Sequence, residues 1–358
     1  MVEFINYLRV FATILITNSH YAGIWPVSAM ASGGLLGNII FFAASGFCLF
    51  KIKENFGKWF LKRFLRIYPV MILFTLLMWL VGPYSQYDTT WLFLFPTHYV
   101  FIVWIMACYV VYYFVAYFQN KYPNKKIAEF ALIGILLAHI AVYLIFVDKS
   151  AYVIDQVEQP FILFLYMMSM LMGALLRKYQ EKFKKLKWYT VALAVVFVGA
   201  YFASKFVLDR YSNLAFLQIF NQYIILGALF FIFTTFMGLE EKLQKLNGKW
   251  KGVIKFIASL TLHIYIVQYV IIGWFSHLVF PLNFFVVTAL ILVMATALYF
   301  AEKYIKLGIV MLVKLIKAKY SKNSVQSVTA EQVEIVSEQA NEAIAEIQIG
   351  EGESDAEN

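Results

Sequence analysis

Long apolar runs recur along the whole chain, and they restrict the fold more than any other feature. A membrane-spanning helix needs about 20 consecutive apolar residues, and in lipid only helices and closed barrels hydrogen-bond all of their own backbone groups. Apolar residues make up 62% of the sequence and charged residues only 14%, so a soluble domain of this size would expose aggregating surface. We predict an all-α polytopic membrane protein with about ten transmembrane helices. The predicted runs are 4–24, 35–52, 67–83, 98–119, 127–147, 160–177, 187–208, 215–237, 254–279 and 283–313.

Basic residues gather in alternate loops between these runs. The loops numbered two, four, six and eight, and the segment after the last run, are rich in Lys and Arg. The odd-numbered loops contain only Lys149, Lys205 and Arg210. Such alternation is the positive-inside pattern, and it predicts that both termini are cytoplasmic (N-in/C-in). The net charge of +9 then reflects attraction to anionic lipid and needs no nucleic-acid partner.

The C-terminal segment differs in charge from everything before it. From residue 323 onward there is no Lys or Arg, but Glu recurs up to Glu357. We divide the chain into a transmembrane unit, 1–315, and a cytoplasmic acidic tail, 316–358, that is largely disordered or weakly helical. The abrupt reversal of charge suggests that the tail binds a protein partner.

One polar stripe follows the first run. Arg9 and His20 are eleven residues apart, so on a helix they lie within about 20° of each other and about 16 Å apart along the axis. Thr13 and Thr17 fall on the same stripe, and Asn6 lies near its inner end. Ionisable groups within a bilayer usually face the bundle interior and carry function. The alternative is that Arg9 snorkels to the inner interface and His20 caps the outer end of the helix.

Two other short segments carry candidate residues. Arg63 and Arg66 are three residues apart and share a face if this loop is helical. The arginine fork suits phosphate oxygens, although simple positive-inside anchoring would also explain the pair. In the second run, Ser45 and Gly46 are small enough to permit close helix packing.

The remaining polar residues of the runs are more easily explained by structure. We expect interhelical hydrogen bonds at Gln218, Asn221 and Gln222 and around His263, and a structural role for His139. Cys48 and Cys108 offer no metal-binding spacing, so we expect buried thiols and no metal. No Asp or Glu is expected deep in a span, where a proton-coupled transporter would often have one.

Several of these segments, in their order along the chain, resemble one known family. RVFATILITNSH (residues 9–20) is an R-x10-H pattern, FFAASGF (41–47) contains a second-helix SGF, and KRFLRIYP (62–69) contains R-x-x-R. SLTLHIYIVQ (259–268) is similar to a later S-x-x-IYL-x-H segment. Together they resemble the membrane-bound acyltransferase-3 family, which includes O-acetyltransferases of bacterial surface polysaccharides. The chain departs from the family pattern at Gln268, where many members have His, and in the fourth run, which lacks a Glu found in many members.

The resemblance implies transfer of an acetyl group from acetyl-CoA to a hydroxyl of a capsular or other cell-surface polysaccharide, or of its lipid-linked precursor, in the bacterial cytoplasmic membrane. By the same analogy Arg9 and His20 are the catalytic pair, and Arg63 and Arg66, with Arg9, bind the donor. A neutral His20 imidazole could take the proton of the attacking hydroxyl. No carboxylate is evident to orient it, so Thr17 or a residue of another span would have that role. As substrate-binding residues we assign Ser45, Tyr265 and Gln268.

A second function class is also open. Many spans and a polar interior suit a transporter or flippase of a polyprenyl-linked glycan equally well. Discontinuous spans in matching halves would favour transport, and the sequence does not show two matching halves.

Overall fold

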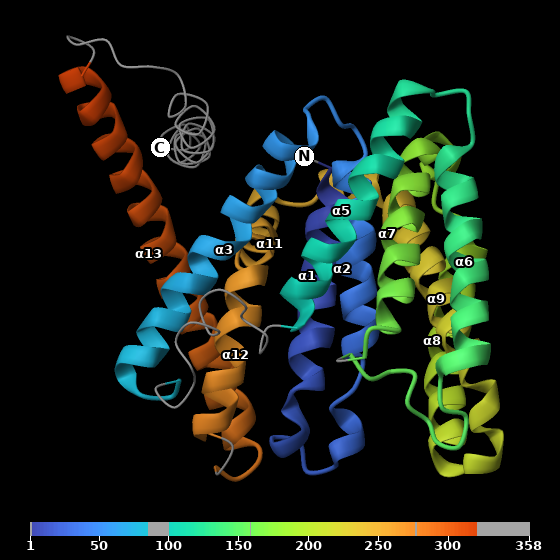
Figure 1. Ribbon diagram of the computed structural model, residues 1–358. Helices are drawn as coiled ribbons and strands as arrows, with labels where there is room; N and C mark the ends of the chain where they lie inside the picture. Colours follow the sequence, from blue (N-terminus) through green and yellow to red (C-terminus); the bar gives the residue numbers. More distant parts are fainter. Residues whose placement is uncertain (1, 85–99, 158, 276–277, 321–358) are drawn as a thin grey trace.

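The computed structural model describes residues 2–84, 100–157, 159–275 and 278–320, and every regular element within these ranges is a helix (Figure 1). The longer helices run side by side as a bundle. The elements are α1 (Glu3–Ser19), η1 (Tyr21–Gly23), η2 (Ser28–Met30), α2 (Gly34–Leu49), α3 (Phe56–Val81), α5 (Val100–Lys121), α6 (Ile127–Phe146), α7 (Ile162–Lys178), η3 (Gln180–Phe183), α8 (Trp188–Arg210), η4 (Ser212–Leu217), α9 (Gln218–Gly238), α10 (Glu240–Gln244), α11 (Gly248–Ser259), α12 (Thr261–Phe275) and α13 (Leu282–Tyr320).

The all-α polytopic class is confirmed. Each of the predicted runs contains a helix, and within the described residues seven helices are long and apolar enough to cross a membrane, or eight if α11 and α12 form one bent span. α1 and α7 have only 17 residues each. The count of ten spans and the N-in/C-in orientation stay predictions. α13 continues through residues 316–320, and the rest of the predicted tail, 321–358, lies outside the described residues. We call the end of the bundle that holds the N-terminus the basic end.

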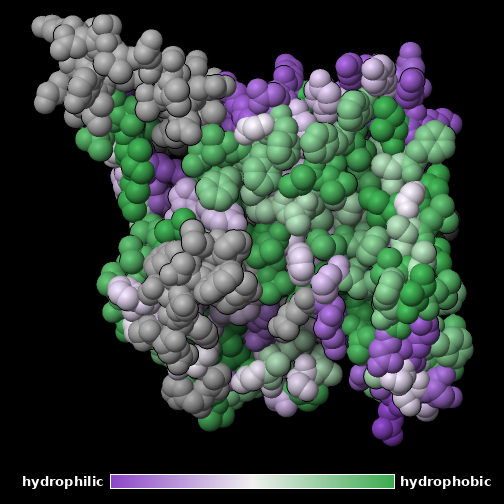
Figure 2. Space-filling view, in the orientation of Figure 1, coloured by the Kyte–Doolittle hydropathy of each residue, from purple (hydrophilic) through white to green (hydrophobic). Residues whose placement is uncertain are grey.

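The surface matches a lipid environment. Figure 2 shows hydrophobic residues over the middle of the visible face and hydrophilic residues gathered along its upper and lower margins. α6 and α8 have the fewest buried residues of the candidate spans, and side chains such as Phe146, which is 77% exposed, point outward. These two helices lie at one edge of the bundle (Figure 1).

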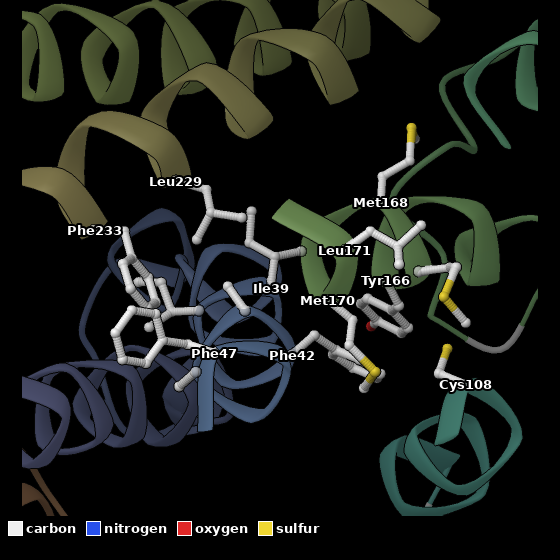
Figure 3. Close-up of a cluster of buried hydrophobic side chains, with 14 of the residues drawn as sticks. Ile39, Phe42, Phe47, Cys108, Tyr166, Met168, Met170, Leu171, Leu229 and Phe233 are labelled. Atoms are coloured by element: carbon white, nitrogen blue, oxygen red, sulfur yellow. The ribbon is translucent and has the colours of Figure 1, made fainter. Parts of the chain in front are cut away.

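Two hydrophobic cores meet at α1. The larger core joins α2, α5, α7 and α9 to the first part of α1 through Phe4, Leu8 and Ala12. Figure 3 shows part of it, including Phe42 of α2, whose ring stacks on that of Tyr166 of α7 at 4.3 Å. The smaller core joins α3, α12 and α13 to the far end of α1 through Ile16. α1 is thus the helix on which both halves of the bundle are assembled.

Glycines allow α2 and α7 to approach each other closely. A Cβ atom added at Gly46 of α2 would overlap the carbonyl oxygen of Met170 in α7, and one added at Gly173 of α7 would overlap that of Ala43 in α2. Backbones that approach this closely are typical of small-residue packing in membranes. The expected packing role of Gly46 is therefore confirmed.

Four details of the sequence interpretation are corrected. α3 begins at Phe56 rather than near residue 67, because Asn55 caps it by accepting a hydrogen bond from the Lys58 N–H, so Arg63 and Arg66 lie on a helix rather than in a loop. The ninth run is two helices, α11 and α12, bent by 61°. Cys48 is exposed, although both cysteines are free thiols. A carboxylate does lie within a span, because Glu302 of α13 is buried.

The polar residues of α9 have the expected structural role. Gln222 and Tyr223 hydrogen-bond the two ring nitrogens of His139 in α6, and Gln218 and Asn221 bond to the segment 148–153 and to α8. His139 is fully buried in this network. Its structural assignment is confirmed.

Candidate active site

Four arginines from three helices gather near the basic end of α1. Arg9 of α1 interacts electrostatically with Arg66 of α3, and both interact with Cys48 of α2, as does Arg177 of α7. Arg63 of α3 joins Arg9 and Arg66 around the Tyr109 side chain. We call Arg9, Arg63, Arg66 and Arg177 the arginine group.

No carboxylate balances most of this charge. Within the described residues, Arg9, Arg66 and Arg177 form no ion pair. Arg177 donates to the neutral Oε1 of Gln180 at 3.0 Å, and its guanidinium lies 5.0 Å above the Phe47 ring. Like charges held together in this way repel one another, so an anion bound between them would be favoured.

Two residues of this neighbourhood, Cys48 and Arg9, are accessible to solvent. The Cys48 thiol is exposed even though protein surrounds it on most sides, and Arg9 keeps partial exposure deep within the bundle. Ser45, one turn before Cys48, forms a side-chain hydrogen bond with Tyr109. The predicted residues Arg9, Arg63, Arg66 and Ser45 are thus brought into one neighbourhood.

A second polar group lies at the far end of α1. The His20 Nε2 atom is 3.2 Å from the Tyr269 hydroxyl of α12, and their rings meet edge to face at 4.6 Å. Thr17 donates a hydrogen bond of 2.9 Å to Gln268 Oε1, and Tyr265 hydrogen-bonds to Tyr269. We call these five residues the histidine group. It brings His20 together with both α12 residues, Tyr265 and Gln268, that the sequence predicted.

The other polar residues of the α1 stripe are buried within the bundle rather than exposed on its surface. Thr13 is buried and its hydroxyl donates to the Arg9 carbonyl of its own helix at 2.8 Å, and Asn6 is buried nearer the basic end. The imidazole of His20, which is the C-cap of α1, packs on α12. Eleven helical residues separate the two groups by about 16 Å.

Sequence reasoning missed two members of these groups. Tyr269 contacts His20 directly, and its spacing of one turn from Tyr265 was the available signal. Tyr269 is the residue of another span that hydrogen-bonds His20, while Thr17 hydrogen-bonds Gln268. Arg177, the last residue of the predicted run 160–177, was not singled out from the sequence, and it lies in the last turn of α7.

A separate ionisable cluster lies between α12 and α13. His263 Nε2 is 2.7 Å from Glu302 Oε2, and Lys306 pairs with the other Glu302 oxygen at 2.6 Å. This cluster is not part of either group described above. Groups of three or more metal-ligating side chains are absent from the part of the chain that the structure describes.

Comparison with known families decides the assignment. A family model described as an acyltransferase domain matches residues 2–301. The chain belongs to the acyltransferase-3 family. Searches of curated proteins and of solved structures found no match.

Membership in the acyltransferase-3 family makes this protein a membrane acyltransferase that takes an acyl donor and an acyl acceptor. The matched region contains the whole arginine group and the whole histidine group, and it ends one residue before Glu302. Both groups therefore belong to the part of the chain that defines the family.

Proposed function

We propose that this protein is an integral membrane O-acetyltransferase that moves an acetyl group from cytoplasmic acetyl-CoA to a hydroxyl of a cell-surface or capsular polysaccharide, or of its lipid-linked precursor. The observation that carries the proposal is the connection, along one helix, of a hydrogen-bonded imidazole with a group of arginines in which Arg9, Arg66 and Arg177 form no ion pair within the described residues. The proposed location is the cytoplasmic membrane of a bacterium.

The arginine group suits the polyanionic end of the donor. Guanidinium forks bind phosphate oxygens in pairs, and solvent access at Cys48 would admit the nucleotide from the basic end. The positive-inside pattern predicts that this end is cytoplasmic, which is where acetyl-CoA would be available. The pantetheine arm would then extend along α1 toward His20.

His20 would act as the general base. Tyr269 engages Nε2, and no described residue hydrogen-bonds Nδ1. We favour the tautomer in which Nε2–H donates to the Tyr269 oxygen, because the Nδ1 lone pair is then available to take the proton of the acceptor hydroxyl. In this arrangement a second side chain holds the catalytic base in position, as is common in enzymes. Since His20 lies opposite the basic end, the acceptor would be modified at the outer side of the membrane.

The direct test compares glycans from cells with and without the protein by mass spectrometry, and measures the release of CoA from acetyl-CoA by membranes containing it. The proposal requires an acetyl group on the glycan that is lost with the protein. Release of CoA that depends on the glycan acceptor would support it further. Glycan with unchanged acetylation would overturn the proposal.

Arg66→Gln is expected to raise the KM for acetyl-CoA by about 10- to 100-fold with a smaller change in kcat. The reason is that a hydrogen bond to a charged group contributes about 1.5–3 kcal/mol, and this one would bind the donor equally in the ground and transition states. Arg177→Gln should also raise the KM for acetyl-CoA.

The matched control is Lys249→Gln, which removes a positive charge near the beginning of α11 from an exposed side chain outside the arginine group. It should leave the KM unchanged. An equal rise in both variants would mean that overall positive charge, rather than the arginine group, attracts the donor.

The flippase alternative has two observations in its favour. α11 and α12 are bent by 61° relative to each other, as expected for a broken span or a re-entrant loop, and the buried Glu302 is a carboxylate within the predicted run 283–313. A flippase would move lipid-linked glycan without consuming acetyl-CoA, so the release of CoA distinguishes the two functions.

A further inference from the structure

Three fully buried glutamines of the bundle differ in the hydrogen bonds that their side-chain amides form. In α9, Gln218 accepts from the Val153 and Ile154 N–H groups and donates to two backbone carbonyls. Gln222 bonds through both amide atoms, to His139 and to the Ile154 carbonyl. Gln268 of α12 uses only its oxygen, because its Nε2 has no hydrogen-bond partner although the residue is completely buried.

The orientation of the Gln268 amide is set by its neighbour. Thr17 donates to Oε1 at 2.9 Å, which directs the NH2 group to the opposite side of the amide plane. The Tyr269 side chain interacts with the Gln268 amide, but its hydroxyl does not meet the geometry of a hydrogen bond with Nε2; the same hydroxyl bonds His20. The unsatisfied donor is therefore within the histidine group, next to the proposed base.

An unpartnered buried donor is costly. Leaving such a group without a hydrogen bond costs about 1–3 kcal/mol, and most buried polar groups avoid this. The two satisfied glutamines of α9 show that this bundle can meet the requirement elsewhere. A site that keeps one donor free beside a base is poised for an acceptor oxygen that arrives with the substrate.

We propose that the Gln268 side-chain amide donates a hydrogen bond to the acyl oxygen of the donor thioester and stabilises the oxyanion that forms there. This inference rests on the proposed function. It makes Gln268 a catalytic residue, with Thr17 as the positioning residue that aims its amide.

The chemistry balances with the groups present. The acceptor hydroxyl oxygen forms a bond to the thioester carbon while its proton passes to His20 Nδ1, and the C=O electron pair moves onto the acyl oxygen, which accepts the hydrogen bond from Gln268 Nε2. When the C=O bond re-forms, the C–S bond breaks. The thiolate leaves and takes the proton back from His20. A donor placed at the developing negative charge acts mainly on the transition state.

Gln268→Leu tests the proposal in membranes of the source cells, which contain the natural acceptor, supplied with radiolabelled acetyl-CoA. We expect kcat to fall by about 10²–10³-fold, the effect of removing one oxyanion donor, with the KM for acetyl-CoA within about threefold. Gln268→Glu should be impaired at least as strongly, because a carboxylate repels the oxyanion. Thr17→Val should give an intermediate loss.

Gln222→Leu is the matched control, since it removes a fully satisfied buried amide. It should lower the thermal unfolding midpoint of the purified protein, because His139 and the Ile154 carbonyl lose their partner. Gln268→Leu should leave that midpoint close to the wild-type value, because the hydrogen bond that it loses from Thr17 is offset by the removal of the unsatisfied Nε2 donor. Lost activity without lost stability is a result that a structural role would not produce.

Transfer by Gln268→Leu at a wild-type kcat would overturn this inference, and so would a loss confined to KM or accompanied by unfolding. Those outcomes leave the proposed function intact as long as the wild-type protein acetylates the glycan. Absence of transfer by the wild-type protein, by contrast, overturns the proposed function itself.

Discussion

His20→Ala is expected to lower acetyl transfer by about 10²–10⁴-fold, the usual contribution of a general base. The imidazole is the ionisable group of the histidine group, and Tyr269 is positioned to orient it. The decrease should be in kcat, because the arginine group that would bind the donor lies about 16 Å away along α1. Incorporation of radiolabelled acetyl into the glycan is the measurement.

Two further variants distinguish the loss of a catalytic group from damage to the fold. Ile14→Ala alters the same helix at a side chain that is 60% exposed, so it should transfer acetyl at the wild-type rate. Tyr269→Phe keeps the ring that packs on His20 and removes the hydroxyl, so a smaller loss is expected than for His20→Ala. Wild-type transfer by a folded His20→Ala protein would eliminate the proposed base.

Gly46→Ala and Gly173→Ala are expected to destabilise the protein by at least about 3 kcal/mol, the upper part of the range for overpacking. Each added methyl group would overlap a backbone carbonyl oxygen of the partner helix, and a backbone cannot move aside as a side chain can. α2 and α7 would have to separate, which disturbs the larger core. The thermal unfolding midpoint of detergent-purified protein measures the effect.

Gly134→Ala in α6 and Gly199→Ala in α8 are the matched controls. An added Cβ meets nothing within 4 Å at either position, and alanine favours a helix over glycine by roughly 1 kcal/mol. Both controls should therefore unfold at or above the wild-type midpoint. If all four variants behaved alike, close approach of α2 and α7 would not be what stabilises the fold.

The all-α class and the place of each helix followed from the sequence because lipid leaves a chain few choices. An apolar run of sufficient length must be helical whatever it packs against. The ends of a helix were harder to predict where its first turns carry many charged residues. The Lys and Arg residues before Ile67 suggested a loop, yet the Asn55 cap starts α3 more than two turns earlier. The capping residue Asn55 is visible in the sequence, but the basic residues that follow it favoured the interpretation as a loop.

The candidate site was predictable along α1 and unpredictable across the bundle. Helical periodicity places Arg9 and His20 on one stripe without any knowledge of neighbours. The partners of that stripe are residues up to 251 positions away, as in the bond from Thr17 to Gln268, and they depend on how helices pack. The positions of Arg177 and Tyr269 are of this kind. Glu302 was missed for a different reason, because Lys303 and Lys306 beside it suggested the charged segment that follows a span, although all three lie within the predicted run 283–313.

The role of α1 as the helix shared by both cores has a consequence for which donors the protein can use. α1 fixes the distance between the guanidinium groups and the imidazole, so under the proposed function it would set the length of donor that can reach both. A short acetyl thioester that lacks the nucleotide would reach only the imidazole, and a nucleotide without the thioester arm would reach only the guanidinium groups. Selectivity for one size of carrier would then come from the first helix of the chain rather than from any pocket shaped around the acetyl group.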